Sequence, residues 1–141
     1  MTLSLVTLQM LTRIPLEFLR WMKRPSDENV QRMSTMIAKT PPPPYYAVIF
    51  SSVRTMGDNG YSEMSEKMVE LASKQDGFLG METARAGIGI TVSYWRDLDS
   101  IKKWRENIDH SVARRKGRSD WYKYFKARIA KVERDYSFEK D

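Results

Sequence analysis

The residue of this chain best suited to proton transfer is His110, the single histidine among 141 residues. Histidine is the one side chain whose ordinary pKa lies near neutrality, so His110 is the first candidate for a general base. Such a base could ionise a phenolic substrate, and Arg54 or Arg105 could help a dry pocket to stabilise the anion that forms. The alternative interpretation is a surface or capping histidine at a helix junction.

Trp104 is the second candidate for a catalytic role. It lies at the centre of an apolar stripe at helical spacing in residues 98–108, a pattern typical of core packing. As part of a pocket wall, its indole could also press against an aromatic substrate. Because Trp104 and His110 are six residues apart, one continuous helix would place them on different faces. A break near Asn107 or Asp109 would turn His110 inward.

Four further residues are candidates for substrate binding, namely Ser51, Arg54, Tyr94 and Trp95. Ser51 carries a hydroxyl on an otherwise apolar strand, although a backbone group could equally satisfy it. Tyr94 and Trp95 end another strand, where neighbouring side chains point to opposite faces of a sheet. One of the two should therefore meet the helices and the other the opposite side.

The chain is basic, with a formal net charge of +6. A basic balance favours anionic partners in general. The run 114–118 is interpreted as a solvated helix end, where cations also suit the helix dipole. The aromatic cluster at 121–125 is interpreted as interface packing rather than as a platform for single-stranded nucleic acid. We expect no nucleic-acid partner.

Composition argues against several kinds of chemistry. The chain has no cysteine, which removes disulfides, thiolate nucleophiles and zinc–thiolate sites. That composition fits a reducing compartment, so we expect a cytoplasmic location. With one histidine and no paired metal carboxylates, a protein-bound metal centre is not expected. The Gly-Ile-Gly at 87–89 precedes a strand rather than a helix, which argues against a dinucleotide site.

The first 44 residues differ from the rest of the chain. Residues 3–22 are rich in apolar side chains, and the four prolines at 41–44 form a stiff spacer that marks a domain boundary. The apolar start is too short and too interrupted for a membrane span, and no positive charge precedes it as in a signal peptide. It could be an amphipathic helix on a membrane or a partner. We favour a poorly ordered arm, or a start codon assigned too far upstream.

The segment 45–136 is predicted to be one α+β domain, followed by a tail at 137–141. Its hydrophobic periodicity predicts the order strand, helix, strand, strand, helix, strand. The predicted strands are 45–53, 78–86, 88–95 and 125–136, and the predicted helices begin near 61 and 98.

The strands at 45–53 and 88–95 carry apolar or small residues on both faces. When helices cover one face of a sheet, the other face is normally polar and exposed to solvent. A single domain of this size has no helices to spare for the second face. We therefore predict that a second copy of the chain covers it, sheet against sheet, in a homodimer.

Four segments resemble the antibiotic-biosynthesis-monooxygenase family: 45–50, 77–80, 89–95 and the helix that carries Trp104. The pattern is Phe-Leu-Gly before a strand, a strand that ends in Tyr-Trp, and a tryptophan six residues into the next helix. The resemblance covers about residues 45–136. It implies a ferredoxin-like βαββαβ fold with an antiparallel sheet, a dimeric α/β barrel, and a ligand cavity between sheet and helices in each subunit.

The family resemblance also implies a function. It points to a monooxygenase that acts on a small aromatic or quinol-like compound without a cofactor, with His110 and Trp104 as catalytic residues. A non-catalytic small-ligand-binding or stress-response dimer is the alternative.

Haem is the one cofactor that the resemblance leaves open. In the haem-degrading branch an asparagine on the first strand, a tryptophan on the second helix and a histidine act together. Trp104 matches the tryptophan, but the asparagine position falls near Ser51 or Ser52 and the histidine position near Arg114. Haem degradation is therefore the least favoured of the three functions.

Overall fold

The computed structural model describes residues 26–139, and the chain divides into two compact units, residues 1–36 and 37–141. In the first unit, helix α3 (Asp27–Ser34) begins after Ser26, whose hydroxyl accepts a hydrogen bond from the backbone N–H of Asn29. The apolar start predicted as an arm lies outside the described residues. None of the helices in the described range is long and apolar enough to cross a lipid bilayer.

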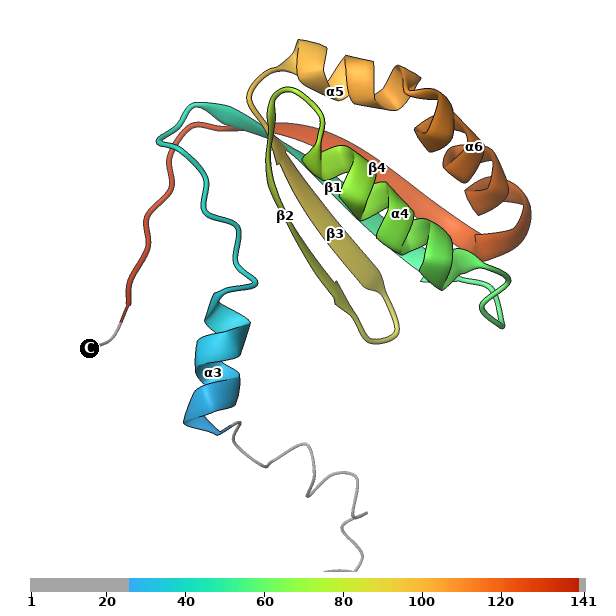
Figure 1. Cartoon of the computed structure of the whole chain (residues 1–141), viewed down its shortest axis with the longest axis horizontal. Coiled ribbons are helices and arrows are strands. Elements are labelled where there is room, and N and C mark those ends of the chain that lie inside the picture. Colours follow the sequence, from blue (N-terminus) through green and yellow to red (C-terminus); the bar gives the residue numbers. More distant parts are fainter. Residues whose placement is uncertain (1–25, 140–141) are drawn as a thin grey trace, which may run out of the picture. The chain divides into compact units, whose positions relative to one another are not determined.

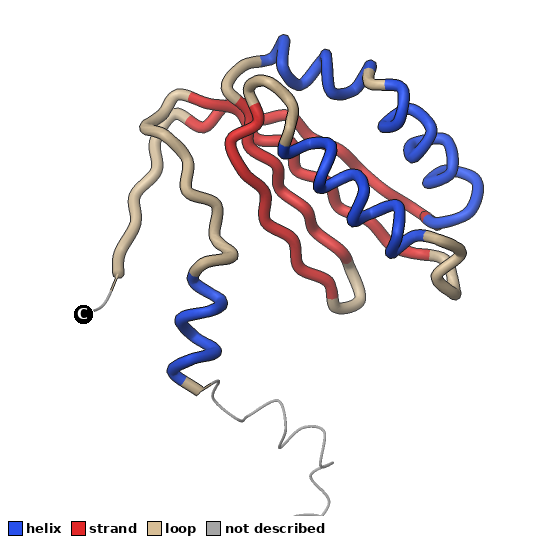
Figure 2. The backbone as a smooth tube through the Cα atoms, viewed as in Figure 1, coloured by secondary structure: helices blue, strands red, loops and turns tan. Residues whose placement is uncertain are grey.

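The second unit is a four-stranded antiparallel sheet with helices on one face, as Figures 1 and 2 show. Its elements in chain order are β1 (Tyr45–Arg54), α4 (Tyr61–Ser73), β2 (Phe78–Arg85), β3 (Gly89–Trp95), α5 (Leu98–Glu106), α6 (Ile108–Lys116), the π-helical turn η1 (Gly117–Trp121) and β4 (Tyr122–Val132). The strand order β2-β3-β1-β4 and the βαββαβ sequence confirm the predicted ferredoxin-like α+β fold. The last strand begins at Tyr122 rather than Phe125, because the turn η1 leads directly into it.

The register of the strands decides which side chains face the helices. β1 is central, and its Val48 lies opposite Ser93 of β3 and Ile129 of β4. Because side chains alternate along a strand, this row and the rows two residues away point to the helices. Trp95 belongs to the same set and is fully buried, with 0% of its surface exposed. Most of the core therefore lies between this face of the sheet and helices α4, α5 and α6, while Tyr45 and Ala47 are buried on the opposite face.

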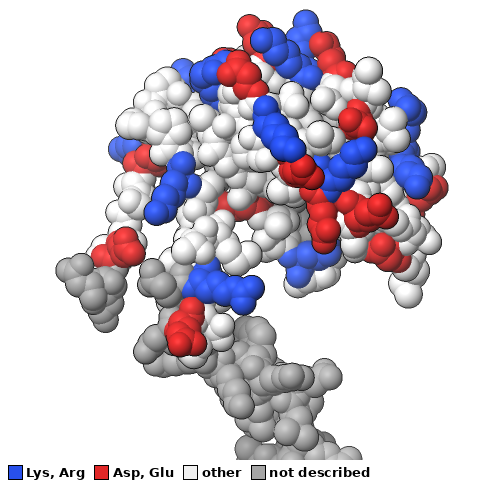
Figure 3. Space-filling model, viewed as in Figure 1, with Lys and Arg blue, Asp and Glu red and all other residues white. Residues whose placement is uncertain are grey.

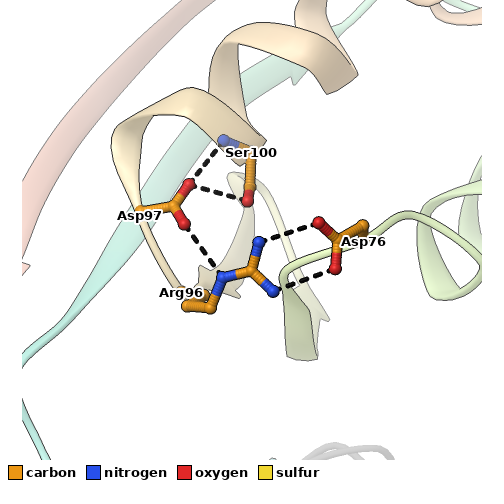
Figure 4. A network of polar contacts seen from close by, with 4 residues as sticks. All are labelled: Asp76, Arg96, Asp97 and Ser100. Atoms are coloured by element: carbon orange, nitrogen blue, oxygen red, sulfur yellow. Dashed lines mark hydrogen bonds and ion pairs between the residues drawn. The ribbon is translucent and has the colours of Figure 1, made fainter.

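A polar network fixes the start of α5 against the loop that follows α4 (Figure 4). The guanidinium of Arg96 donates two hydrogen bonds to Asp76, of 2.9 and 2.8 Å, and one of 2.9 Å to Asp97. Asp97 caps α5 by accepting from the backbone N–H and hydroxyl of Ser100, each at 2.7 Å. Those bonds and Arg96 hold the pKa of Asp97 at about 2. Gly77, at φ +84°, passes so close that a β-carbon would lie 2.0 Å from the Ser100 oxygen.

Among the residues that the structure describes, the segment before β1 covers one end of the opposite face of the sheet. The backbone N–H of Ala38 donates to one carboxylate oxygen of Glu82 at 2.9 Å, and the hydroxyl of Tyr94 donates to the other at 3.1 Å. Toward the other end, apolar side chains remain open to solvent. Ile90 is 46% exposed and Val53 is 37% exposed.

Candidate active site

A cavity of about 580 Å³ lies between the helix-facing side of the sheet and the helices above it. Its floor is formed by side chains of all four strands: Val48, Phe50, Met81, Thr83, Thr91, Ser93, Trp95, Phe125, Ala127 and Ile129. Its walls come from α4, α5, α6 and η1 and include Tyr61, Met64, Met68, Trp104, His110 and Trp121. Most of these residues are apolar or aromatic, so the cavity suits a flat, largely apolar ligand.

Trp104 and His110 meet at the cavity wall because the helix breaks between them. Helix α5 ends at Glu106, and Asn107 adopts φ −55° and ψ 134°, outside the helical range. The Asn107 side chain then accepts from the backbone N–H of His110 at 3.2 Å and so caps α6. This break stacks the imidazole on the Trp104 indole, with ring centres 4.4 Å apart and planes 8° apart.

A backbone contact sets the tautomer of His110. The imidazole Nδ1 lies 2.9 Å from the carbonyl oxygen of Trp104. A carbonyl oxygen can only accept a hydrogen bond, so Nδ1 carries the proton in the neutral ring. The lone pair is then on Nε2, for which the described residues supply no hydrogen-bond partner. A neutral imidazole with a free Nε2 on a cavity wall is the arrangement that a general base requires.

The surroundings of His110 keep its imidazole neutral. Burial lowers the pKa of His110 below its usual value near 6.5, and the positive charge of Arg114 lowers it further. The hydrogen bond to Trp104 acts in the opposite direction but does not outweigh burial. His110 is therefore present as the free base at neutral pH.

This lowered pKa can be measured directly, because His110 is the single histidine. In a proton NMR titration of the untagged protein, we expect the His110 Hε1 resonance to titrate with a midpoint below 6.5. The folded protein should also lose stability as the pH falls below 6.5, since the unfolded chain then binds the proton more tightly, and the loss should stop below the folded-state pKa. A midpoint at or above 6.5 would show that His110 is solvated rather than buried.

The floor of the cavity contains a few hydroxyl groups among its apolar side chains. Ser93 accepts a hydrogen bond of 2.9 Å from the indole N–H of Trp95, and the hydroxyls of Thr83 and Thr91 lie 3.0 Å apart. Trp95 also stacks against Trp104, with ring centres 6.2 Å apart. These contacts connect the cavity floor to the Trp104–His110 pair.

The structure brings three of the six predicted site residues to the cavity, namely His110, Trp104 and Trp95. Ser51 and Tyr94 lie on the opposite face of the sheet, paired in register with Ile90 and Ala47. Arg54 is not part of the cavity lining either. Its guanidinium lies 3.6 Å over the ring of Tyr61, and it donates to the carbonyl oxygens of Gly57 at 2.9 Å and Asp58 at 3.2 Å.

Three arginines line the cavity: Arg105, Arg114 and Arg118. The sequence suggests Arg105 as a partner of His110, whereas it assigns Arg114 and Arg118 no binding role and places both in a run interpreted as a solvated helix end. Their spacing of four residues, which places two side chains on one side of a helix, is the signal that could have identified them. Within residues 26–139, no group of three or more His, Cys, Asp or Glu side chains could hold a metal ion.

Comparison with known proteins gives one relative in sequence and several in structure, although no family model matches the chain. The uncharacterized protein YqjZ of Bacillus subtilis is 51% identical over 111 residues, which are 77% of this chain and 97% of YqjZ. The name of this relative states no activity.

The similar solved structures share the fold at low sequence identity. Rv0793 from Mycobacterium tuberculosis has a TM-score of 0.59 and 11% identity, over 66% of this chain and 99% of that one. SnoaB, a cofactor-independent oxygenase from Streptomyces nogalater, has a TM-score of 0.57 and 8% identity, over 64% and 95%. A putative antibiotic biosynthesis monooxygenase from Nitrosomonas europaea has a TM-score of 0.55 and 11% identity, over 67% and 94%.

Proposed function

Because this chain belongs to the family of the Bacillus subtilis protein YqjZ and has the fold of the antibiotic-biosynthesis monooxygenases, we propose that it is a cofactor-independent monooxygenase. Its substrate is a small aromatic or quinol-like compound that binds between the sheet and the helices. The observation that supports this proposal most strongly is the neutral His110, with its free Nε2, on the wall of an aromatic cavity.

The proposed reaction begins with proton transfer from a phenolic hydroxyl of the substrate to Nε2 of His110. The electron-rich phenolate then reacts with O₂, so the substrate itself supplies the electrons. One oxygen atom replaces a ring hydrogen and ends as a quinone carbonyl, while the other leaves as water. In balance, a phenol with a free ring C–H plus O₂ gives a quinone plus H₂O.

The cavity favours this chemistry in two ways. Its aromatic wall, in which Trp104 is supported by the buried Trp95, can hold a flat ring in a fixed orientation. Its largely apolar lining would also reduce the contact of a bound ring with water, which strengthens the electrostatic interactions of a bound phenolate with nearby charges.

The proposal is tested by measuring oxygen uptake with a panel of naphthols, anthrols and hydroquinones, without flavin, metal or external reductant. We expect uptake with at least one polycyclic phenol, and ¹⁸O₂ should place one labelled atom in the product. If no phenol or quinol in the panel supports uptake above the rate without protein, the proposed activity is wrong.

A second candidate is a non-catalytic module that holds a small ligand in the same cavity. The apolar lining supports this function as well, because it needs no base. Native mass spectrometry of the protein purified from its own cells separates the two. A retained ligand that is never converted in the presence of O₂ favours the binding module.

The residues present fit haem degradation poorly. His110 could offer Nε2 as one axial donor, but the strand position of the family's asparagine is occupied by serines. Ser51 lies on the face away from the cavity, and the buried hydroxyl of Ser52 accepts a hydrogen bond of 2.8 Å from Arg85. An unchanged haem spectrum on mixing would remove this function.

We also propose a homodimer that forms through the face of the sheet opposite the helices. The support is the apolar surface that Ile90 and Val53 leave open beyond the segment bonded to Glu82. Sheet packing over this surface would remove apolar area from water, at roughly 25 cal/mol per Å². A cytoplasmic location likewise remains a proposal, based on the cysteine-free composition.

The dimer is tested with Ile90→Glu, which places a charge in the proposed interface. We expect sedimentation velocity to show a dimer for the natural protein and a monomer for this variant at micromolar concentration, because a buried unpaired carboxylate is strongly unfavourable. Val112→Glu is the matched control, since Val112 is exposed on α6 and should leave the dimer intact. A well-folded monomer of the natural protein would contradict the proposal.

A further inference from the structure

The cavity carries positive charge and no negative charge. Its lining includes Arg105 at the end of α5, Arg114 on α6 and Arg118 in η1, and it includes no aspartate or glutamate. The outer surface is different, because Figure 3 shows basic and acidic side chains interspersed over the face that it draws. A cavity whose charged lining residues are all cations would favour an anionic ligand.

The three arginines have no carboxylate partners within the described residues. The ion pairs found there join Lys67 to Asp109, Lys74 to Glu70, and Arg96 to Asp76 and Asp97. The cavity arginines are absent from all of them. Like charges so arranged repel one another, and the pKa of Arg114 is lowered by burial and then by Arg105 and Arg118.

The structural roles of these arginines use only part of their hydrogen-bonding capacity. One amino group of Arg114 donates to the backbone carbonyl of Arg105 at 3.2 Å, near the end of α5. The guanidinium of Arg118 lies 5.7 Å from the ring centre of Phe125 on the cavity floor. A guanidinium has five N–H donors, so both retain donors for an anion, and a planar carboxylate matches their geometry.

We propose that the ligand of this cavity is an aromatic compound that carries a carboxylate, which binds Arg105, Arg114 and Arg118 while the ring lies against Trp104. The carboxylate fixes the ring in one orientation and so decides which part of it faces His110. The assignment of a phenolic ring rests on the proposed function, whereas the anion preference rests on the arginines alone.

The test compares two probes of the same shape, 6-hydroxy-2-naphthoate and its neutral amide, 6-hydroxy-2-naphthamide. By isothermal titration calorimetry, we expect the carboxylate to bind at least about 10-fold more tightly than the amide, and only its affinity should fall as ionic strength rises. Arg118→Gln and Arg114→Gln should each weaken the carboxylate about 5-fold and leave the amide unchanged. Because Arg118 is exposed, its variant keeps the test valid even if Arg114→Gln fails to fold.

Arg115→Gln is the matched control, since it removes one positive charge from α6, the helix that carries Arg114, at a position outside the cavity lining. It should change neither affinity. Equal binding of the two probes, or an equal effect of Arg115→Gln and Arg118→Gln, would overturn the proposal, and so would binding of neither probe. If the carboxylate binds more tightly but no phenol supports oxygen uptake, this inference is supported and the monooxygenase proposal is contradicted. If a phenol supports oxygen uptake but the two probes bind equally, the monooxygenase proposal is supported and this inference is contradicted.

Discussion

His110→Ala is expected to lower kcat for oxygen uptake by about 10²- to 10⁴-fold, the range that a positioned general base contributes. The variant removes the imidazole, a neutral and partly buried base with a free lone pair on the cavity wall at neutral pH. Residual activity should rise with pH, because hydroxide then replaces the missing base. The measurement is the initial rate with a polycyclic phenol over a range of pH.

The control for this prediction is Trp104→Phe, which keeps an aromatic face and the backbone carbonyl that bonds Nδ1 of His110. Because the base stays in place, we expect a rise in KM and a fall in kcat of less than about 10-fold. Added imidazole should partly restore His110→Ala but not Trp104→Phe. A rate for His110→Ala within threefold of the natural protein would show that the histidine is structural.

The fold could be predicted from sequence because its signals are local. The apolar periodicity that begins near residue 61 marks α4, which ends at Ser73, and Gly77 with its positive φ lies in the turn before β2. The sequence allowed a break near Asn107 or Asp109, and the structure has it at Asn107, whose short polar side chain caps α6. The start of β4 was missed, because a π-helical turn leaves no periodic signature in five residues.

The site was harder to predict because it depends on pairing between distant strands. From the sequence alone Ser51 and Ser93 look equivalent, because each places a hydroxyl on an otherwise apolar strand. Only the register of β1 with β3 shows that Ser93, opposite Val48, faces the helices while Ser51, opposite Ile90, faces away. A shift of one residue would exchange the two faces.

Trp95→Ala is expected to lower the free energy of unfolding by about 3–5 kcal/mol, the usual cost of truncating a buried tryptophan. Trp95 has 0% of its surface exposed, and its ring packs edge-on against Phe78 with centres 5.3 Å apart. Its indole N–H also donates to Ser93, whose hydroxyl would lose that bond. The measurement is urea unfolding followed by circular dichroism, with the m-value checked for a two-state transition.

The control for Trp95→Ala is Ile108→Ala, because Ile108 is 82% exposed and its truncation should change stability by less than about 0.5 kcal/mol. A loss below about 1 kcal/mol for Trp95→Ala would mean that the cavity floor is not part of the core. A loss of about 3–5 kcal/mol would mean that the cavity floor is part of the core. Trp95 would then be a core residue that supports Trp104 from below, and Trp104 in turn supports His110. This packing would hold the Trp104–His110 pair in place before any ligand binds.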